Sequence, residues 1–262
     1  QVSFGILPAA KTKKEGKKTR IAYFGDSMIE GDLITQTLRD TLQKEYGGQG
    51  VGFVPITSIV NRFRNTVRHD FSDNWEYHNF VKDKKQKMSY GISGEYFHSK
   101  AGEEKPLTVE YRASSAFAGT SRFPMAKLFY GKPVEMELTI DSSKVDSAGN
   151  AIFDTLKITE RANTAIATIG ETTNEYLLNG TNTVNAITLS NSAIQKVGLE
   201  FDISSNLPVY GCSFESKEGV IVDNFASRAN SGITLTSLKP AVLNGFNNHF
   251  SYDLIVLHFG LN

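Results

Sequence analysis

The stretch "RIAYFGDSMIEGD", residues 20–32, decides the fold of the amino-terminal part of the chain. Its apolar run, residues 21–24, is typical of a buried strand and ends abruptly at Gly-Asp-Ser. Ser27 therefore follows directly on the carboxyl end of the expected strand. Two interpretations are open at this point: an ordinary strand-to-helix turn, or a serine nucleophile that is held toward a substrate.

The segment after the serine, "DLITQTLRDTLQKEYGG" (32–48), predicts a helix. Its apolar residues recur every four positions and so share one helical face. These residues are Ile34, Leu38, Leu42 and Tyr46. Asp32 is expected to cap the amino-terminal end, and Gly47 with Gly48 to end the helix. A strand followed by such a helix is typical of the start of an α/β unit.

The chain then changes character. Between about residues 60 and 215, short alternating segments are separated by turn signals, which predicts an antiparallel β-sandwich. The strand candidates are "LTVEY" (107–111), "AKLFY" (126–130), "VEMELTI" (134–140), "DTLKIT" (154–159), "EYLLN" (175–179), "NAITLS" (185–190) and "VGLEFDI" (197–203).

The α/β signature returns near the carboxyl-terminal end. "GVIVDNF" (219–225) and "YDLIVLHFG" (252–260) are near-continuous apolar runs, which we expect to be strands covered on both faces. Between them, "GITLTSLKPAVLNGF" (232–246) is a helix candidate, provided that Pro240 lies in the first turn. The sequence therefore predicts an α/β fold with a parallel sheet that is interrupted by an inserted antiparallel β-sandwich.

The three apolar runs place particular residues at one edge of the predicted parallel sheet. Ligands of open α/β sheets bind beyond the carboxyl ends of the strands, where we expect Ser27, Gly232 and Asn262. A serine hydroxyl can attack an ester carbonyl. The developing oxyanion needs fixed donors, which the N–H groups of Gly232 and Ser27 and the Asn262 carboxamide can supply.

At these residues the sequence resembles the SGNH (GDSL) hydrolases. "FGDSMIEGD" resembles their first block, "NFASRANSGITLTSL" their second, and "LIVLHFGLN" their third, in the family order. The resemblance implies a flavodoxin-like three-layer fold, with Ser27 as nucleophile and with Gly232 and Asn262 as oxyanion-hole residues. It implies this domain organisation: a tail at 1–19, the hydrolase domain at 20–58 and 216–262, and the inserted sandwich at 59–215.

The sequence departs from this family at the fourth block. The Asp-x-x-His motif, which supplies the general base and its partner, does not occur in these 262 residues. We expect it beyond Asn262; a complete but inactive chain is the alternative. A serine without a base is a weak nucleophile.

The inserted segment bears on the substrate. Peptidoglycan O-acetylesterases among these hydrolases carry a β-sandwich between the first and second blocks, and "GGQGVGFVP" (47–55) resembles the entry to it. This resemblance implies a serine esterase that removes O-acetyl groups from a bacterial or dietary polysaccharide, without a cofactor. The alternatives are a glycan-binding protein on a decayed hydrolase scaffold, and a lipase or thioesterase.

The bulk composition excludes several partners. The formal net charge is zero, which gives no electrostatic reason for a nucleic-acid partner. No apolar run approaches the ~20 residues of a membrane span.

The chain begins at Gln1 rather than Met, which is typical of a protein whose leader has been removed, so we expect a secreted, periplasmic or cell-surface location. The single cysteine, Cys212, forms no internal disulfide and no zinc cluster.

Further candidate residues have alternative interpretations. Arg228 is a candidate for binding a substrate anion, or an ordinary surface arginine. Trp75 and Tyr77, in the aromatic and basic segment 62–80, are candidates for contact with a sugar, although packing is the more common role. Asp26 is expected to bind neighbouring backbone N–H groups. His258 is expected in the core. The histidines show no recognised metal spacing, so we predict no metal site.

Overall fold

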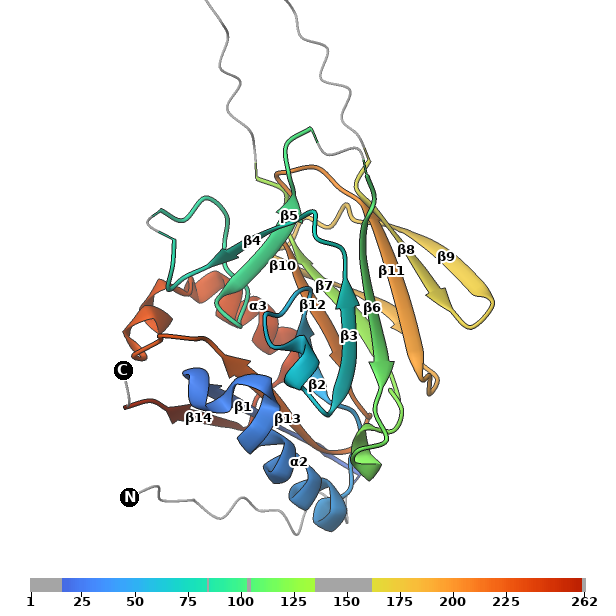
Figure 1. The fold of residues 1–262 in the computed structure, drawn as a ribbon, viewed down its shortest axis with the longest axis vertical. Helices are drawn as coiled ribbons and strands as arrows, with labels where there is room; N and C mark the ends of the chain where they lie inside the picture. Colours follow the sequence, from blue (N-terminus) through green and yellow to red (C-terminus); the bar gives the residue numbers. More distant parts are fainter. Residues whose placement is uncertain (1–15, 84, 103–104, 135–161, 261–262) are drawn as a thin grey trace, which may run out of the picture.

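The structure is a computed structural model that describes residues 16–83, 85–102, 105–134 and 162–260. These residues form three β-sheets and two α-helices (Figure 1). Sheet A is parallel and has three strands in the order β13-β1-β14. Its strands are β1 (Lys18–Gly25), β13 (Gly219–Ala226) and β14 (Leu254–His258).

The other two sheets are antiparallel. Sheet B has the order β10-β7-β12-β5-β4, with β2 paired to β12; sheet C has the order β3-β6-β11-β8-β9. Sheet B consists of β2 (Gly52–Pro55), β4 (Trp75–Asn79), β5 (Glu95–Ser99), β7 (Ala126–Gly131), β10 (Val184–Ser190) and β12 (Val209–Phe214). Sheet C consists of β3 (Val67–Phe71), β6 (Leu107–Ala113), β8 (Thr164–Ile169), β9 (Thr172–Leu177) and β11 (Lys196–Asp202).

Sheets B and C, together called the two-sheet region below, enclose one apolar core. Strands of both sheets contribute to it, and the large side chains Phe97, Phe201 and Phe214 are at most 1% exposed. Trp75 packs edge-on against Phe201, with 5.2 Å between the ring centroids. Alternate residues along β6 and β11 are buried in this core, which is the pattern of a strand with one solvent-facing side.

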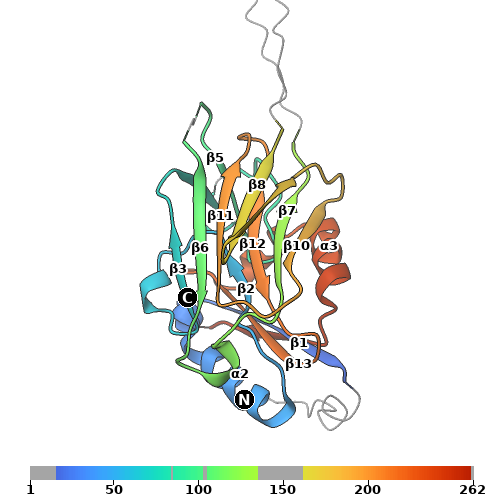
Figure 2. The ribbon, with the colours of Figure 1, turned by 90° about the vertical axis from the view of Figure 1, so that its right-hand side faces the viewer.

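An α-helix packs on each face of sheet A. Helix α2 (Leu33–Tyr46) packs on one face through Leu38 and Leu42. Helix α3 (Pro240–Phe250) lies on the other face, between sheet A and sheet B, and runs beside β10 (Figure 2). The short 3-10 helices are η1 (Ser27–Asp32), η2 (Asn61–Phe63), η3 (Ala118–Thr120) and η4 (Ile233–Ser237).

The predicted fold class, a three-layer α/β parallel sheet, is wrong for this structure. Most strands belong to the two antiparallel sheets, and the parallel sheet among the described residues has three strands with two α-helices beside it. The prediction gave too much weight to the apolar runs at the two ends of the chain. The strands between them outnumber the parallel ones, and they pair with each other rather than with sheet A.

Several individual elements were predicted well. Helix α2 begins and ends as expected, and Gly47 at its carboxyl end has a positive φ of 79°. Pro240 does lie in the first turn of α3, although η4 replaces the helix expected before it. Strands β6, β7, β10, β11, β13 and β14 match predicted segments to within a few residues at each end, whereas β9 shares only residues 175–177 with the segment predicted at 175–179. The candidates at 134–140 and 154–159 lie essentially outside the described residues.

The expectation that both apolar runs are covered on both faces fails for β14. β13 is almost entirely buried, but Ile255 and Leu257 on β14 are 60% and 63% exposed. In the described residues β14 pairs on one side only, with β1, and so forms an edge of sheet A. His258 at its end is half-buried rather than in the core.

A buried ionic cluster joins sheet A to sheet B. The Arg20 guanidinium on β1 is fully buried and donates to Asp223 on β13 at 2.6 and 2.9 Å. It also pairs with the buried Glu215 and donates to the Ser213 hydroxyl on β12 at 3.0 Å. Burial would lower the pKa of Arg20, but Asp223 and Glu215 raise it above its ordinary value. The cluster therefore fixes how the two sheets meet.

Candidate functional site

The segment around Ser27 is a short, capped turn. Asp26 adopts an extended conformation at the amino-terminal end of η1, and its carboxylate accepts the Met28 N–H at 2.8 Å. This bond confirms the backbone-binding role that was expected of Asp26. Ser27 itself is exposed, whereas Ile29 is fully buried beneath it. The turn therefore presents the serine to solvent while its apolar side holds it to the sheet.

Polar contacts from α2 and β13 hold the turn in place, and the apolar pattern of the sequence does not reveal them. Asn224 on β13 donates to the Ile29 carbonyl oxygen at 2.8 Å. Asp32, with a positive φ of 67°, accepts two bonds from the buried Arg39 guanidinium at 2.6 and 3.0 Å. Arg39 also donates to the carbonyl oxygen of Val222 on β13 at 2.8 Å. The turn is thus anchored to both α2 and β13.

Asp32 is ionised and strongly held. Burial alone would raise its pKa, but the charges of Arg39 and Arg64 and the hydrogen bond from Thr35 lower the pKa to about 2. It also accepts the Thr66 hydroxyl at 2.5 Å, just before β3 of the two-sheet region. This residue was expected to cap α2 with its side chain, and no such cap bond forms. Its carboxylate instead connects the serine turn to sheet C.

The carboxyl ends of the three parallel strands meet beside this turn. In the parallel register Gly25 is paired with Ala226 of β13 and with His258 of β14. The Ser227 N–H donates to the Gly25 carbonyl oxygen at 3.0 Å, which ties the loop after β13 to the serine turn. The strand ends therefore form one edge, as the sequence predicted.

Gly232 lies in the loop after β13 and faces the segment after β14. Its φ is 90°, and a Cβ placed on it would come within 3.1 Å of the Phe259 ring. A glycine therefore suits this position for both its backbone conformation and its close approach to Phe259. Its N–H donates to the Asn230 carboxamide oxygen at 2.8 Å, and that oxygen also accepts the Thr234 hydroxyl at 2.7 Å. Asn262 lies outside the described residues.

The two residues predicted to bind substrate occupy different environments. The Arg228 side chain is exposed and pairs with Glu30 of the serine turn at 2.6 Å. Trp75 is 7% exposed, and its indole N–H donates to the Thr108 carbonyl oxygen at 3.1 Å. Trp75 thus takes the packing role that was the alternative for it, and little of its ring surface is available to a sugar.

The histidines hold no metal cluster in the part of the chain that the structure describes. His69 is buried, with its Nε2 2.9 Å from the Ile56 carbonyl oxygen, and burial lowers its pKa to about 4. His258 lies at the strand-end edge, with its Nδ1 3.1 Å from the Tyr23 hydroxyl.

Neither of the two α-helices in the described residues reaches the length and hydropathy that crossing a membrane requires.

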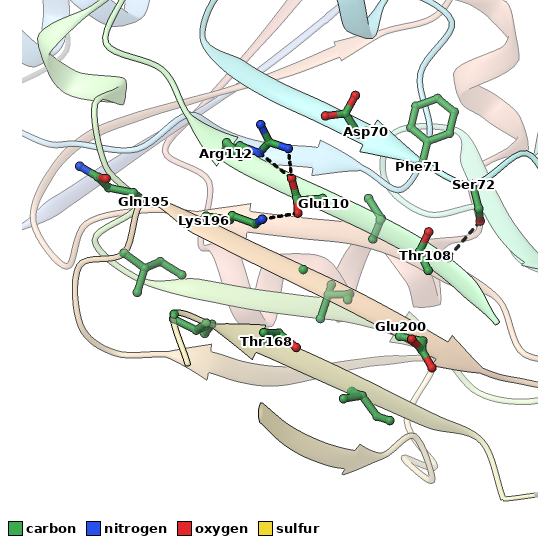
Figure 3. A pocket seen from close by; sticks show the side chains of 17 residues that line it. Asp70, Phe71, Ser72, Thr108, Glu110, Arg112, Thr168, Gln195, Lys196 and Glu200 are labelled. Carbon is green, nitrogen blue, oxygen red and sulfur yellow. Dashed lines mark hydrogen bonds and ion pairs between the residues drawn. The ribbon is translucent and has the colours of Figure 1, made fainter. Parts of the chain in front are cut away.

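Two hollows in the surface are relevant to ligand binding. A cavity of about 240 Å³ lies beside the serine turn and is lined by residues of η1, the end of β13, β4 and β5. A larger and more open groove, about 960 Å³, runs over the outer face of sheet C (Figure 3). In that groove Glu110 lies between Arg112 and Lys196 and pairs with both. The groove is lined by sheet C and its connecting loops, and no residue of η1 is among its lining.

Two residues that line the small cavity were not predicted. Glu95 and Asn79 face each other across the β4–β5 pair, in direct register. Neither residue belongs to a recognisable sequence motif, because β4 and β5 form an ordinary antiparallel strand pair. The sequence signal nearby was the aromatic segment that contains Tyr77, which also lines the cavity.

Comparison with known proteins adds a fold likeness. No protein-family model matches the chain, and no curated protein sequence matches it either. Among solved structures, one described as "Peptidoglycan O-acetylesterase in action, 5 min" is similar, with a TM-score of 0.63 and 18% sequence identity. The likeness covers 96% of this chain and 60% of that one, so the chain spans about three-fifths of its length. The chain therefore has an esterase-like fold.

Proposed function

We propose that the protein is a serine esterase that hydrolyses O-acetyl esters of carbohydrate, with Ser27 as the nucleophile. The observation that carries the proposal is the exposed Ser27 on a capped, anchored turn where three parallel strands end. The esterase-like fold supports it at a coarse level. Ser27 would attack the acetyl carbonyl carbon, the sugar alkoxide would leave with a proton, and water would then release acetate from the acyl-enzyme.

The proposed oxyanion donors are the N–H groups of Ser27 and Gly232 and the carboxamide of Asn262. The Gly232 N–H already has the Asn230 carboxamide as acceptor, so binding an oxyanion requires it to share or exchange this partner. One donor of this kind typically contributes about 10²–10³ in rate. The role of Asn262 rests on the resemblance to SGNH hydrolases. We propose the residue roles of that family for this chain, but not its three-layer fold.

The proposal includes an arrangement of the chain in which segments 20–58 and 216–262 form the catalytic part and 59–215 an insertion. Strand β2 of the first segment pairs with β12 of the proposed insertion, so the two parts share sheet B. We further propose that the protein acts outside the cytoplasm, where cell-wall and dietary polysaccharides occur, and that it needs no cofactor.

The test is a rate measurement on the full-length protein with 4-nitrophenyl acetate. We expect Ser27→Ala to lower the rate by at least about 10³-fold, because the nucleophile is lost. Ser192→Ala is the matched control: it removes a hydroxyl from another exposed serine, one located in the two-sheet region. Equal rates for wild type and Ser27→Ala would contradict the proposal.

A second candidate is a glycan-binding protein without catalysis. The open groove on sheet C, which combines apolar surface with the charged side chains of Glu110, Arg112 and Lys196, favours it. This candidate predicts no esterase activity in the full-length protein, together with glycan binding that Lys196→Ala weakens. The rate measurement therefore separates the two functions.

A further inference from the structure

The cavity beside the serine turn is built from both regions of the molecule. Glu30 on the serine turn and Arg228 after β13 form one wall, and Tyr77 and Glu95 from β4 and β5 form another. Most of its lining residues carry polar side chains, but most of the surface that lines it is apolar. Its volume of about 240 Å³ is smaller than the ~300–1,000 Å³ of pockets for drug-sized ligands. It therefore suits one small polar unit better than a long acyl chain.

The charges in the cavity largely cancel in pairs. Glu30 pairs with Arg228 at 2.6 Å, and Asp32 is 3.5 Å from Arg64. Glu95 is different, since both of its hydrogen bonds reach the same oxygen: Tyr77 donates to Oε1 at 2.8 Å and Asn79 at 3.4 Å. Within the described part of the chain no hydrogen bond or ion pair reaches its other oxygen. A neutral ligand rich in hydroxyl or amide groups fits such a lining.

The protonation of Glu95 agrees with a neutral ligand. Burial raises its pKa most, the nearby Glu30 charge raises it further, and the bonds from Tyr77 and Asn79 oppose the shift; the resulting pKa is about 7. Near neutral pH the carboxyl group can therefore both donate and accept a hydrogen bond. Sugar hydroxyls likewise donate and accept.

Tyr77 supplies a partly exposed aromatic ring at the same place. It is 37% exposed, and its ring stacks on Phe97 with 5.5 Å between the centroids. Lys82 Nζ lies 5.9 Å from the ring centroid. An amphipathic ring whose position is fixed by a core residue provides contact area at little entropic cost.

A chain of hydrogen bonds connects this cavity to the serine turn. Asn79 Nδ2 lies 3.4 Å from Glu95 Oε1 and 3.3 Å from Ser227 Oγ. The Ser227 N–H in turn donates to the Gly25 carbonyl oxygen at 3.0 Å, two residues before Ser27. Asn79 and Ser227 are both buried. These bonds connect Glu95 to the backbone just before the serine turn, although Ser27 itself is not among the residues that line the cavity.

We propose that this cavity is a sugar-binding subsite, in which Glu95 and Tyr77 bind a pyranose unit of the acetylated substrate next to Ser27. The inference rests on the proposed esterase function and adds the residues that bind the sugar. It assigns carbohydrate selectivity to residues of β4 and β5, which lie in the two-sheet region. A pyranose with acetamido groups and one with hydroxyl groups alone share this chemistry, so both types of glycan enter the test.

The test compares three substrates with wild type, Glu95→Gln and Tyr77→Ala. The substrates are 4-nitrophenyl acetate, O-acetylated peptidoglycan fragments and acetylated xylo-oligosaccharides. We expect the ratio of kcat/KM on one of the glycans to that on the small ester to fall about tenfold in each variant, mainly through KM, because a hydrogen bond or a ring contact to the sugar is lost. The glycan that shows this fall identifies the type of sugar.

The control is Glu76→Gln, which neutralises a carboxylate on β4, the strand of Tyr77, outside the cavity lining. Its ratio should equal that of wild type, and thermal unfolding should show that all variants are folded. Equal losses on all three substrates, or no loss on either glycan, would overturn the subsite while leaving the esterase function intact.

A binding measurement separates failure of the subsite from failure of the esterase function. Titration calorimetry of Ser27→Ala, alone and combined with Tyr77→Ala, uses the same two glycans and needs no turnover. If wild type hydrolyses no ester, glycan binding that is weakened about tenfold by Tyr77→Ala still supports the subsite. Binding that Tyr77→Ala leaves unchanged, or no binding of either glycan, overturns it.

Discussion

The junction between sheets A and B and the core between sheets B and C are built from different chemistry. At the junction, the fully buried Arg20 holds the carboxylates of Asp223 and Glu215, and its guanidinium lies 3.7 Å from the Phe250 ring centroid. In the core of the two-sheet region, apolar side chains such as Leu199 and Phe201 pack against each other. Ionic contacts are directional, whereas apolar contacts are not. We infer that the junction fixes how sheets A and B meet through buried charges that must stay paired, while burial of apolar surface holds the core together.

The largest effect is expected from breaking the junction. Arg20→Ala leaves two carboxylates buried without their cation, which should lower the free energy of unfolding by about 3–5 kcal/mol. Urea unfolding measures this change. Arg112→Ala is the control, since Arg112 pairs with Glu110 on an exposed face and should cost less than about 1 kcal/mol. Similar losses in both variants would contradict the contrast between the two regions.

A truncation in the core should have a slightly smaller effect. Leu199→Ala, at a position 3% exposed, should lower the free energy of unfolding by about 3 kcal/mol through lost burial and a residual cavity. Under conditions where the variant is folded, kcat on 4-nitrophenyl acetate should stay within about twofold of wild type, because the core does not touch the serine turn. A large fall in kcat in the folded variant would show that the two regions are coupled more tightly than we infer.

The pH dependence of stability sharpens the role of the anchored turn. The folded pKa of Asp32, about 2, lies below its ordinary value of 3.8, so its stabilising contribution is present above about pH 4 and is lost as the pH falls through 2. Asp32→Asn should therefore be about 2 kcal/mol less stable than wild type at neutral pH, with a difference that shrinks toward pH 2.

Urea unfolding between pH 2 and pH 7 measures this difference, with Asp40→Asn as the control. Asp40 pairs with the exposed Lys44 one helical turn away, so its loss should have a small effect at every pH. If the deficit of Asp32→Asn is the same at pH 2.5 and at pH 7, the carboxylate does not anchor the turn as an ion.

The sequence predicted individual parallel strands and their shared edge better than it predicted the fold class. Apolar runs at 21–24, 219–225 and 252–260 predicted strands with a shared edge, because a buried parallel strand has a strong local signal. Strand β12 (Val209–Phe214) is fully buried but was missed, because Gly211 and Ser213 interrupt its apolar run and it shows no alternation. The pairing of the intervening strands depends on contacts between distant segments, which local patterns do not specify.

The polar side of α2 shows another limit of periodicity. The sequence predicted an apolar face, and Leu38, Leu42 and Tyr46 do pack on sheet A, whereas Ile34, the fourth residue of that face, is exposed. The most deeply buried residues of the helix are nevertheless Thr35, Arg39 and Gln43. Arg39 and Gln43 donate to carbonyl oxygens of β13, and Thr35 donates to Asp32. A polar side chain is buried here because it has a backbone or carboxylate partner, and such partners are visible only in three dimensions.

The central claim is that Ser27 is a nucleophile, and covalent labelling tests it most directly. The full-length protein would be incubated with a fluorophosphonate ester, digested, and examined by mass spectrometry. The account predicts one phosphonyl adduct, on the peptide that contains Ser27, and none in Ser27→Ala. Hydrolysis of acetate esters by a protein whose Ser27 remains unlabelled would contradict it.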